Sequence, residues 1–304
     1  MPAVMLHWLA SMLRRRVRGV SSVSDRQHRR RRPVLLIIAM ILLGVGVGGR
    51  VGLQLNVYSQ ASGKTGSPEQ RETLYQLLRP VALSNCQLQR FGEAHDGGYL
   101  LCANLLNDVQ TGYSYGINGY DQWGCDVSTR RRVPVHQYDC FNTTRPVCSG
   151  GNTIFHNECV GDSAFKQEGR IFDTMQSQVA KNGDGGKSIV LKIDVEGAEW
   201  GAFLTAPDEF LSRIDQIAVE FHGIDDQKSV AAVRRLKQFF EVAQTHFNNA
   251  TCFGGMKPFP SWAYEVLFVN KRLAVVDPSG KSVDVHPLAA PNIPFFSDCQ
   301  PAAE

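Results

Sequence analysis

Three short motifs that would assign a function at once are absent from this chain of 304 residues. None of the eight cysteines belongs to a C-x-x-C pair, which excludes the common zinc and thioredoxin-type sites. No Asp-x-Asp pair occurs, and Asp194-Val195-Glu196 only approaches the paired carboxylates of a metal-dependent glycosyltransferase. Gly186-Lys187-Ser188 resembles the end of a phosphate-binding P-loop, but Lys181 stands where that loop needs a glycine. We therefore expect no metal site and no P-loop.

An excess of basic residues is absent from the chain after position 50. Residues 51–304 carry 22 Lys and Arg against 28 Asp and Glu, so the net charge of +3 arises from the ten arginines of residues 1–50. Nucleic-acid phosphates bind to basic surfaces. We therefore expect no nucleic-acid partner for the part of the chain that folds.

The sixteen residues 34–49 carry no charge. Nine arginines come before this run, and Arg50 comes directly after it. A run of this kind is near the shortest that spans a bilayer, and the positive-inside rule leaves its arginine-rich end in the cytosol. The pattern predicts a basic cytosolic tail over 1–33, a transmembrane signal anchor over 34–50 and a linker over 51–67. A cleaved signal peptide and a mitochondrial transit peptide are the alternatives.

The cysteines and two glycosylation sequons agree with export of the chain. An even number of cysteines in an exported protein favours disulfides, whose pairing the sequence leaves open. Asn142-Thr143-Thr144 and Asn249-Ala250-Thr251 are N-glycosylation acceptors, which are used only in the secretory pathway. The sequence therefore predicts a single-pass type II membrane glycoprotein. Its main domain is expected in the lumen of the Golgi or another endomembrane compartment, or outside the cell.

Strand-like and helix-like segments alternate over 68–275, which predicts βαβ units and a parallel sheet. A Gly/Pro-rich loop joins the last two strands, so these are expected to form an antiparallel pair at one edge. We expect an α/β domain of the doubly wound class with seven strands, the last one antiparallel, and a surface-wrapping tail over 276–304. Asp96-Gly97-Gly98 indicates a turn before a strand over 99–103. The expected sheet strands are 112–115, 133–138, 153–159, 188–193, 216–221, 242–247 and 264–269, and the clearest expected helices begin at 68, 171 and 230.

Carboxylates lie at or near the ends of four of these strands, at the edge where open α/β sheets bind ligands. They are Asp139, Asp162, Asp194 and Glu220. A loop with Gly116, Asn118 and Gly119 follows the first strand, and its glycines let a ligand approach the backbone. Asp139 comes 20 residues after Gly119, the spacing at which an acid binds a ribose diol. Such an edge suits a cationic ligand with hydroxyls, such as S-adenosylmethionine, and repels the pyrophosphate of a dinucleotide.

Four segments carry a resemblance to a known family. They are Asp-Gly-Gly-Tyr at 96–99, Tyr-Ser-Tyr-Gly-Ile at 113–117, Lys-Ile-Asp-Val-Glu-Gly-Ala-Glu-Trp at 192–200 and Glu-Phe-His at 220–222. The chain from 89 to 270 resembles the FkbM-type and, more specifically, the methyltransferase-like protein 24-type methyltransferases that use S-adenosylmethionine. The resemblance implies a Rossmann-like class I methyltransferase tethered behind an N-terminal membrane helix.

The resemblance also implies roles for individual residues. It places Gly116 and Asn118 at the cofactor loop, Asp139 on the ribose, Asp162 near the adenine and Asp194 at the methionine end or the transfer site. Ser114 and Cys140 depart from the usual pattern, which has an acid before the glycine loop and a proline after the ribose acid.

Methyl transfer mainly requires alignment of the acceptor with the methyl carbon and sulfur. A hydroxyl acceptor also needs a base. His222 is the first candidate and Asp194 the second, and Glu220 lies on the same strand face as His222, where we expect it to orient the imidazole. Glu196 and Glu199 are expected to cap the following helix. The expected function is O-methylation of a sugar or another small hydroxylated acceptor. The alternatives are a lumenal metal-dependent glycosyltransferase and an inactive binding protein with a methyltransferase fold.

Overall fold

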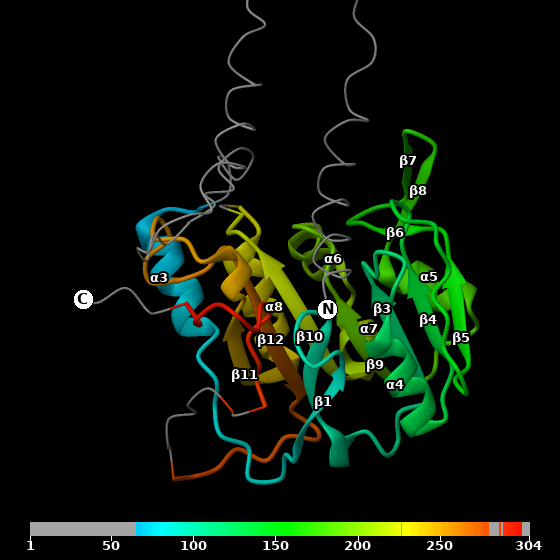
Figure 1. The fold of residues 1–304 in the computed structure, drawn as a ribbon, viewed down its shortest axis with the longest axis horizontal. Helices are drawn as coiled ribbons and strands as arrows, with labels where there is room; N and C mark the ends of the chain where they lie inside the picture. The colour runs from blue at the N-terminus through cyan, green and yellow to red at the C-terminus, as the bar shows by residue number, and fades with distance from the viewer. Residues whose placement is uncertain (1–64, 226, 280–285, 287, 300–304) are drawn as a thin grey trace, which may run out of the picture. The chain divides into compact units, whose positions relative to one another are not determined.

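The computed structural model of the protein describes residues 65–225, 227–279, 286 and 288–299. Its centre is a seven-stranded sheet in the order β11-β12-β10-β9-β3-β4-β5 (Figure 1). Five neighbouring strands, from β10 to β5, run parallel, and β12 runs antiparallel to both β10 and β11. The sheet strands are β3 (Thr111–Tyr115), β4 (Val135–Tyr138), β5 (Thr153–His156), β9 (Ile189–Ile193), β10 (Ile214–His222), β11 (Phe240–Phe247) and β12 (Ala263–Asn270). The expected α/β class, the seven strands and the reversed last strand are confirmed.

Different elements cover the two faces of the sheet. The helices are α3 (Pro68–Leu77), α4 (Gln122–Arg131), α5 (Met175–Lys181), α6 (Glu199–Thr205), α7 (Asp208–Arg213) and α8 (Ser229–Phe239), with short 3₁₀ turns at Ala103–Leu105 and Asn249–Thr251. In β9, Ile189, Leu191 and Ile193 share a core with helices α3, α5, α6, α7 and α8, whereas Val190 faces a second core that includes α4. Every residue of β9 is buried, Lys192 included, as the mostly apolar run predicts for a strand covered on both faces.

The second core also contains a β-hairpin that lies outside the main sheet. β1 (Leu88–Gly92) and β2 (Gly98–Cys102) pair antiparallel, which confirms the turn expected at 96–98. The side-chain amide of Gln216 in β10 accepts from Cys102 N at 2.8 Å and donates to Cys102 O at 2.9 Å. These two bonds attach the hairpin to β10 and so bring Tyr99 to the carboxyl end of the sheet.

The expectation for 153–179 is wrong in two places. The expected strand over 153–159 divides into β5 and β6 (Cys159–Val160), which pairs with β8 (Arg170–Asp173) in a separate sheet of order β6-β8-β7 that includes β7 (Phe165–Gln167). The expected helix at 171 begins only at Met175, because Thr174 caps it by accepting from Ser177 N at 3.3 Å. Glu168 and Gly169 both have positive φ, which suits a tight hairpin turn between β7 and β8. This hairpin extends beyond the main sheet in Figure 1.

All eight cysteines form disulfides, which confirms the expected bonding and supplies the pairing. The pairs are Cys86–Cys102, Cys125–Cys148, Cys140–Cys159 and Cys252–Cys299. Disulfides of this number are typical of an oxidising, secretory-type compartment. The expected anchor at 34–50 lies outside the described residues, and no helix within them is long and apolar enough to cross a membrane.

Candidate functional site

The site lies at the carboxyl edge of the sheet, where β3 and β9 end in direct backbone contact. Gly116 has φ +74°, and a Cβ on this residue would lie 1.6 Å from the carbonyl oxygen of Asp194. Gly116 N donates to Tyr138 O at 3.0 Å, and Asp194 N donates to Tyr115 O at 3.2 Å. Only glycine fits at 116, so the predicted cofactor loop begins against the backbone of Asp194.

Asp139, the predicted ribose ligand, fastens this loop to the end of β4. Its Oδ2 accepts from Asn118 N at 2.7 Å, and its Oδ1 accepts from Phe141 N at 2.8 Å and Asn142 N at 2.9 Å. A carboxylate oxygen accepts two hydrogen bonds, so Oδ2 retains one acceptor position within the described contacts. Gly119 lies against Asn142, whose Nδ2 would be 2.7 Å from a Cβ at 119. The glycine loop and the turn after β4 therefore form one connected unit.

Asp162, the predicted adenine contact, does not follow a strand of the main sheet. It follows β6 in the three-stranded sheet and is exposed. Lys228 Nζ lies 3.1 Å from Asp162 Oδ2, and this hydrogen bond is the main cause that lowers the pKa of Asp162. Its side chain faces Gly201 of α6, where a Cβ would lie 3.1 Å from it. The structure thus places Asp162 beside α6, on a different sheet from Asp139 and Asp194.

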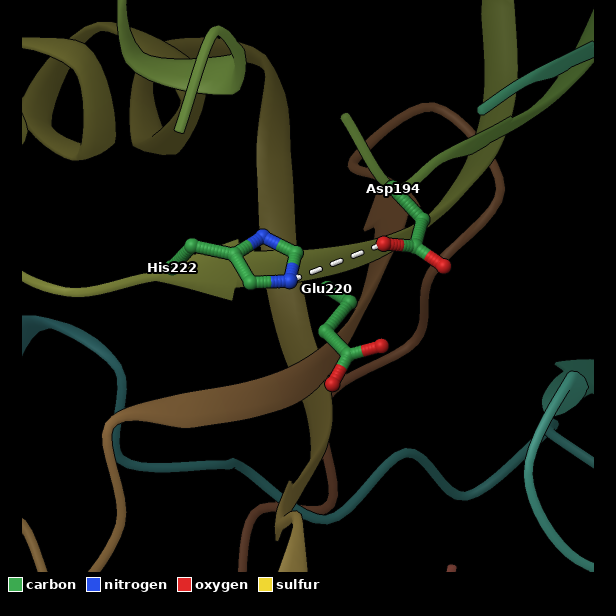
Figure 2. Close-up of side chains that lie close together, drawn as sticks. All are labelled: Asp194, Glu220 and His222. Carbon is green, nitrogen blue, oxygen red and sulfur yellow. Dashed lines mark ion pairs between the residues drawn. The ribbon is translucent and has the colours of Figure 1, made fainter. Parts of the chain in front are cut away.

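The three predicted catalytic side chains come together where β9 and β10 end (Figure 2). The Nε2 atom of His222 lies 3.6 Å from Asp194 Oδ1, and one donor atom from each of Asp194, Glu220 and His222 lies within 4.8 Å of the others. Glu220 and His222 are buried, whereas the Asp194 side chain is 25% exposed. Asp194 is therefore the member that a substrate reaches most directly.

Glu199, and not Glu220 as expected, orients the imidazole. The fully buried Glu199 places Oε1 2.9 Å from His222 Nδ1, and the same oxygen accepts from Val195 N at 2.8 Å. Glu199 is the first residue of α6, but the start of this helix has no side-chain cap, and the Glu199 carboxylate instead accepts from Val195 N in the loop before it. The capping expected of Glu196 and Glu199 is therefore not found. Glu220 instead accepts from Asn248 Nδ2 at 2.6 Å. The ring is held from its Nδ1 side, which leaves Nε2 directed toward Asp194.

The charges of the cluster depend on one another. Burial alone would lower the pKa of His222, but the carboxylate of Glu199 and the hydrogen bond to it raise this pKa to about 10. The imidazole is thus protonated at neutral pH. Burial, followed by repulsion from Asp194, raises the pKa of Glu220 well above its usual range. The cluster is rich in carboxylates relative to its cations.

Tyr99 and Lys192 complete the cluster, and the sequence reasoning assigned neither of them to it. Tyr99 OH donates to Asp194 Oδ2 at 3.2 Å and approaches Glu220 Oε2 at 3.5 Å. Lys192 Nζ donates to Gly116 O at 3.1 Å and lies 3.6 Å from Asp194 Oδ2. The signal for Lys192 was a buried cation inside an apolar strand. Tyr99 had only the weaker signal of the Asp-Gly-Gly-Tyr turn.

A mostly parallel sheet with a glycine loop after β3 and an acid after β4 is typical of α/β proteins that bind a ligand at the carboxyl edge of the sheet. The chain belongs to the family described as methyltransferase domain, whose model matches residues 57–268. The protein is thus a methyltransferase, and so a transferase enzyme. No curated protein and no solved structure matched the chain.

Proposed function

We propose that the protein is a Rossmann-like class I methyltransferase that uses S-adenosylmethionine to O-methylate a sugar or another small hydroxylated acceptor. One observation carries this proposal: the glycine loop contacts the backbone of Asp194 and is hydrogen-bonded to Asp139 at one edge of the sheet. Family membership supports the methyltransferase class, and the sheet order supports the class I fold. The four motifs quoted above support the relation to the methyltransferase-like protein 24 type.

The residues at the edge fit the cofactor. Because Gly116 has no Cβ, the cofactor can approach the backbone of the loop closely. Asp139 Oδ2 can accept one further hydrogen bond, from a ribose hydroxyl. In this proposal Asn118 and Gly119 flank the cofactor, Asp162 lies on its adenine side, and Asp194 lies at its methionine end. The carboxylates of Asp194 and Glu220 are the counter-charges that a sulfonium centre needs. The cofactor supplies an activated methyl group when it is bound.

Asp194 is the group placed to receive the acceptor proton. Its carboxylate is partly exposed, whereas Glu220 is buried and His222 carries a proton at neutral pH. Asp194 would take the proton that a hydroxyl acceptor loses when it receives the methyl group that the cofactor would supply. His222 and Tyr99, each within 3.6 Å of an Asp194 oxygen, hold the carboxylate in position.

The disulfides support a lumenal or extracellular catalytic domain, as the type II anchor hypothesis requires. We place the acceptor among the glycans and small hydroxylated molecules of that compartment. Of the two sequons, Asn249 is buried and donates to Ile293 O and Phe296 O at 3.0 Å. Asn142 is partly exposed, and its Nδ2 donates to Asn118 O at 2.7 Å.

Asp194→Asn is expected to lower kcat for methyl transfer, measured at saturating S-adenosylmethionine, about 100-fold, because the amide cannot accept the hydroxyl proton. The assay follows a labelled methyl group from the cofactor to a panel of glycans and polyols. Asp208→Asn, an exposed acid of α7, is the matched control and keeps full activity. A panel that stays unlabelled while the wild-type protein binds the cofactor would exclude this acceptor class. Full activity in Asp194→Asn would exclude the assigned base.

A further inference from the structure

The cluster of Asp194, Glu220 and His222 has the composition and geometry of a cation site. It offers two carboxylate oxygens and one imidazole nitrogen, and all three donor atoms lie within 4.8 Å of one another. Figure 2 shows the Nε2 side of the ring and the carboxylate of Asp194 directed toward each other, with the Glu220 carboxylate beside them. We propose that Asp194, Glu220 and His222 bind a divalent cation of the Mn²⁺ type, which departs from the sequence-based expectation of no metal site.

The hydrogen bonds around His222 support this proposal independently of the carboxylates. Glu199 occupies Nδ1 at 2.9 Å, and Nε2 has no hydrogen bond within the described part of the chain, although His222 is only 5% exposed. Its nearest ion-pair contacts are 3.6 Å to Asp194 and 3.9 Å to Glu196. A carboxylate that binds one imidazole nitrogen and leaves the other facing the metal is the usual arrangement of a metal-ligating histidine. A bound cation would take the place of the Nε2 proton.

The second carboxylate ligand is supported in the same way. Asn248 Nδ2 donates to Glu220 Oε1 at 2.6 Å, and Tyr99 OH lies 3.5 Å from Glu220 Oε2. These contacts hold a buried carboxylate at the position from which it faces Asp194 and His222. Side chains that hydrogen-bond to a metal ligand fix its orientation, and their loss typically weakens metal affinity tenfold or more.

The surrounding charge also favours a cation. Asp96 and Glu265 add negative charge beside Glu220, and Lys192 is the cation that faces Asp194 from β9. Two carboxylates that share a buried site repel each other unless a proton or a positive ion lies between them. A divalent ion would neutralise this repulsion. Its three ligands already lie together, so their side chains would need to move little to bind it.

The donor set indicates the type of ion and its use. Carboxylates suit Mg²⁺ and Mn²⁺ and imidazole suits later transition metals, so a mixed O,O,N set fits Mn²⁺. Three protein ligands leave positions open for water or for a hydroxyl oxygen of the acceptor. This use, which rests on the proposed function, would make an acceptor with adjacent hydroxyls the preferred substrate, because two oxygens of such a diol can bind one ion.

The test is a Mn²⁺ titration followed by electron paramagnetic resonance, on the full-length chain purified in detergent from an oxidising host and stripped with a chelator. We expect one Mn²⁺ per chain, with affinity weakened at least tenfold in Glu220→Gln and in His222→Gln. The matched control is His246→Gln, since His246 is another buried histidine that faces a glutamate, Glu265, at 3.4 Å. It is expected to keep wild-type affinity, and near-ultraviolet circular dichroism checks that each variant is folded.

Absence of Mn²⁺ binding, or equal binding by the folded variants and the wild type, would overturn the proposal. A titration of S-adenosylmethionine into the same preparation separates the two claims. Cofactor binding without Mn²⁺ binding removes the metal site and leaves the methyltransferase proposal intact. Mn²⁺ binding that follows the expected variant pattern, without cofactor binding, retains the metal site and removes the proposed cofactor use.

Discussion

Gly116→Ala is expected to destabilise the protein by about 3–4 kcal/mol and to abolish binding of S-adenosylmethionine. The new Cβ would lie 1.6 Å from the carbonyl oxygen of Asp194, a contact that backbone atoms can relieve only by separating β3 from β9. Overpacking of this kind costs about 1–3 kcal/mol, and the left-handed conformation of a non-glycine residue adds about 1–2 kcal/mol. Urea unfolding measures the first effect and calorimetric titration of the cofactor the second.

Gly150→Ala is the matched control for this variant. Gly150 has φ +78°, close to the +74° of Gly116, but a Cβ there meets nothing within 4 Å. Gly150→Ala is therefore expected to lower the unfolding free energy only by the cost of the left-handed backbone conformation, about 1–2 kcal/mol. Cofactor affinity is expected to stay unchanged. Equal destabilisation by the two alanines would show that the contact between Gly116 and Asp194 does not constrain the site.

Glu199→Gln is expected to cost about 3 kcal/mol of unfolding free energy and to reduce methyl transfer. The substitution keeps the shape of the side chain but removes the buried charge that faces protonated His222, and loss of one partner of a buried ion pair costs about 3–5 kcal/mol. Glu196→Gln is the control, because Glu196 also faces His222, at 3.9 Å, but is 65% exposed. It is expected to cost less than about 0.5 kcal/mol. Similar costs for the two variants would contradict the role assigned to Glu199.

The same pair of variants predicts a pH effect in chelator-treated protein. The pKa of His222 is raised from 6.5 to about 10 in the fold, so its contribution to stability is complete below pH 6.5 and is lost as the pH rises through about 10. Without the Glu199 carboxylate this pKa falls, and the alkaline loss becomes smaller. Urea unfolding at pH 7 and pH 10 should therefore show a larger decline in the wild type than in Glu199→Gln. An equal decline in unfolding free energy in the two proteins would show that Glu199 does not raise the pKa of His222.

The sequence predicted the sheet well because its signals are local. Apolar runs such as 189–193 identify buried strands, and alternation with helices implies their parallel order. The convergence of Asp194 with Glu220 and His222 follows from the same logic, since parallel strands present their carboxyl ends at one edge. These site residues could therefore be named before the structure was known.

The remaining parts of the site depend on contacts between distant segments. Tyr99 reaches Asp194 only because Gln216 attaches the β1–β2 hairpin to β10, and no local pattern encodes that docking. Glu199 reaches His222 because the loop after β9 turns α6 back over the end of β10. Asp162 was expected on the main sheet because 153–159 looks like one strand, whereas the Cys140–Cys159 disulfide marks the start of a separate sheet.

Calorimetric titration of S-adenosylmethionine into the full-length protein tests the central claim most directly. We expect saturable binding by the wild type and at least tenfold weaker binding by folded Asp139→Ala, about 1.4 kcal/mol. Asp139 positions the Asn118 amide, and in the proposed site it would also accept the ribose hydroxyl. No binding by well-folded wild-type protein would contradict the assigned cofactor site, and would favour a methyltransferase fold used for binding alone.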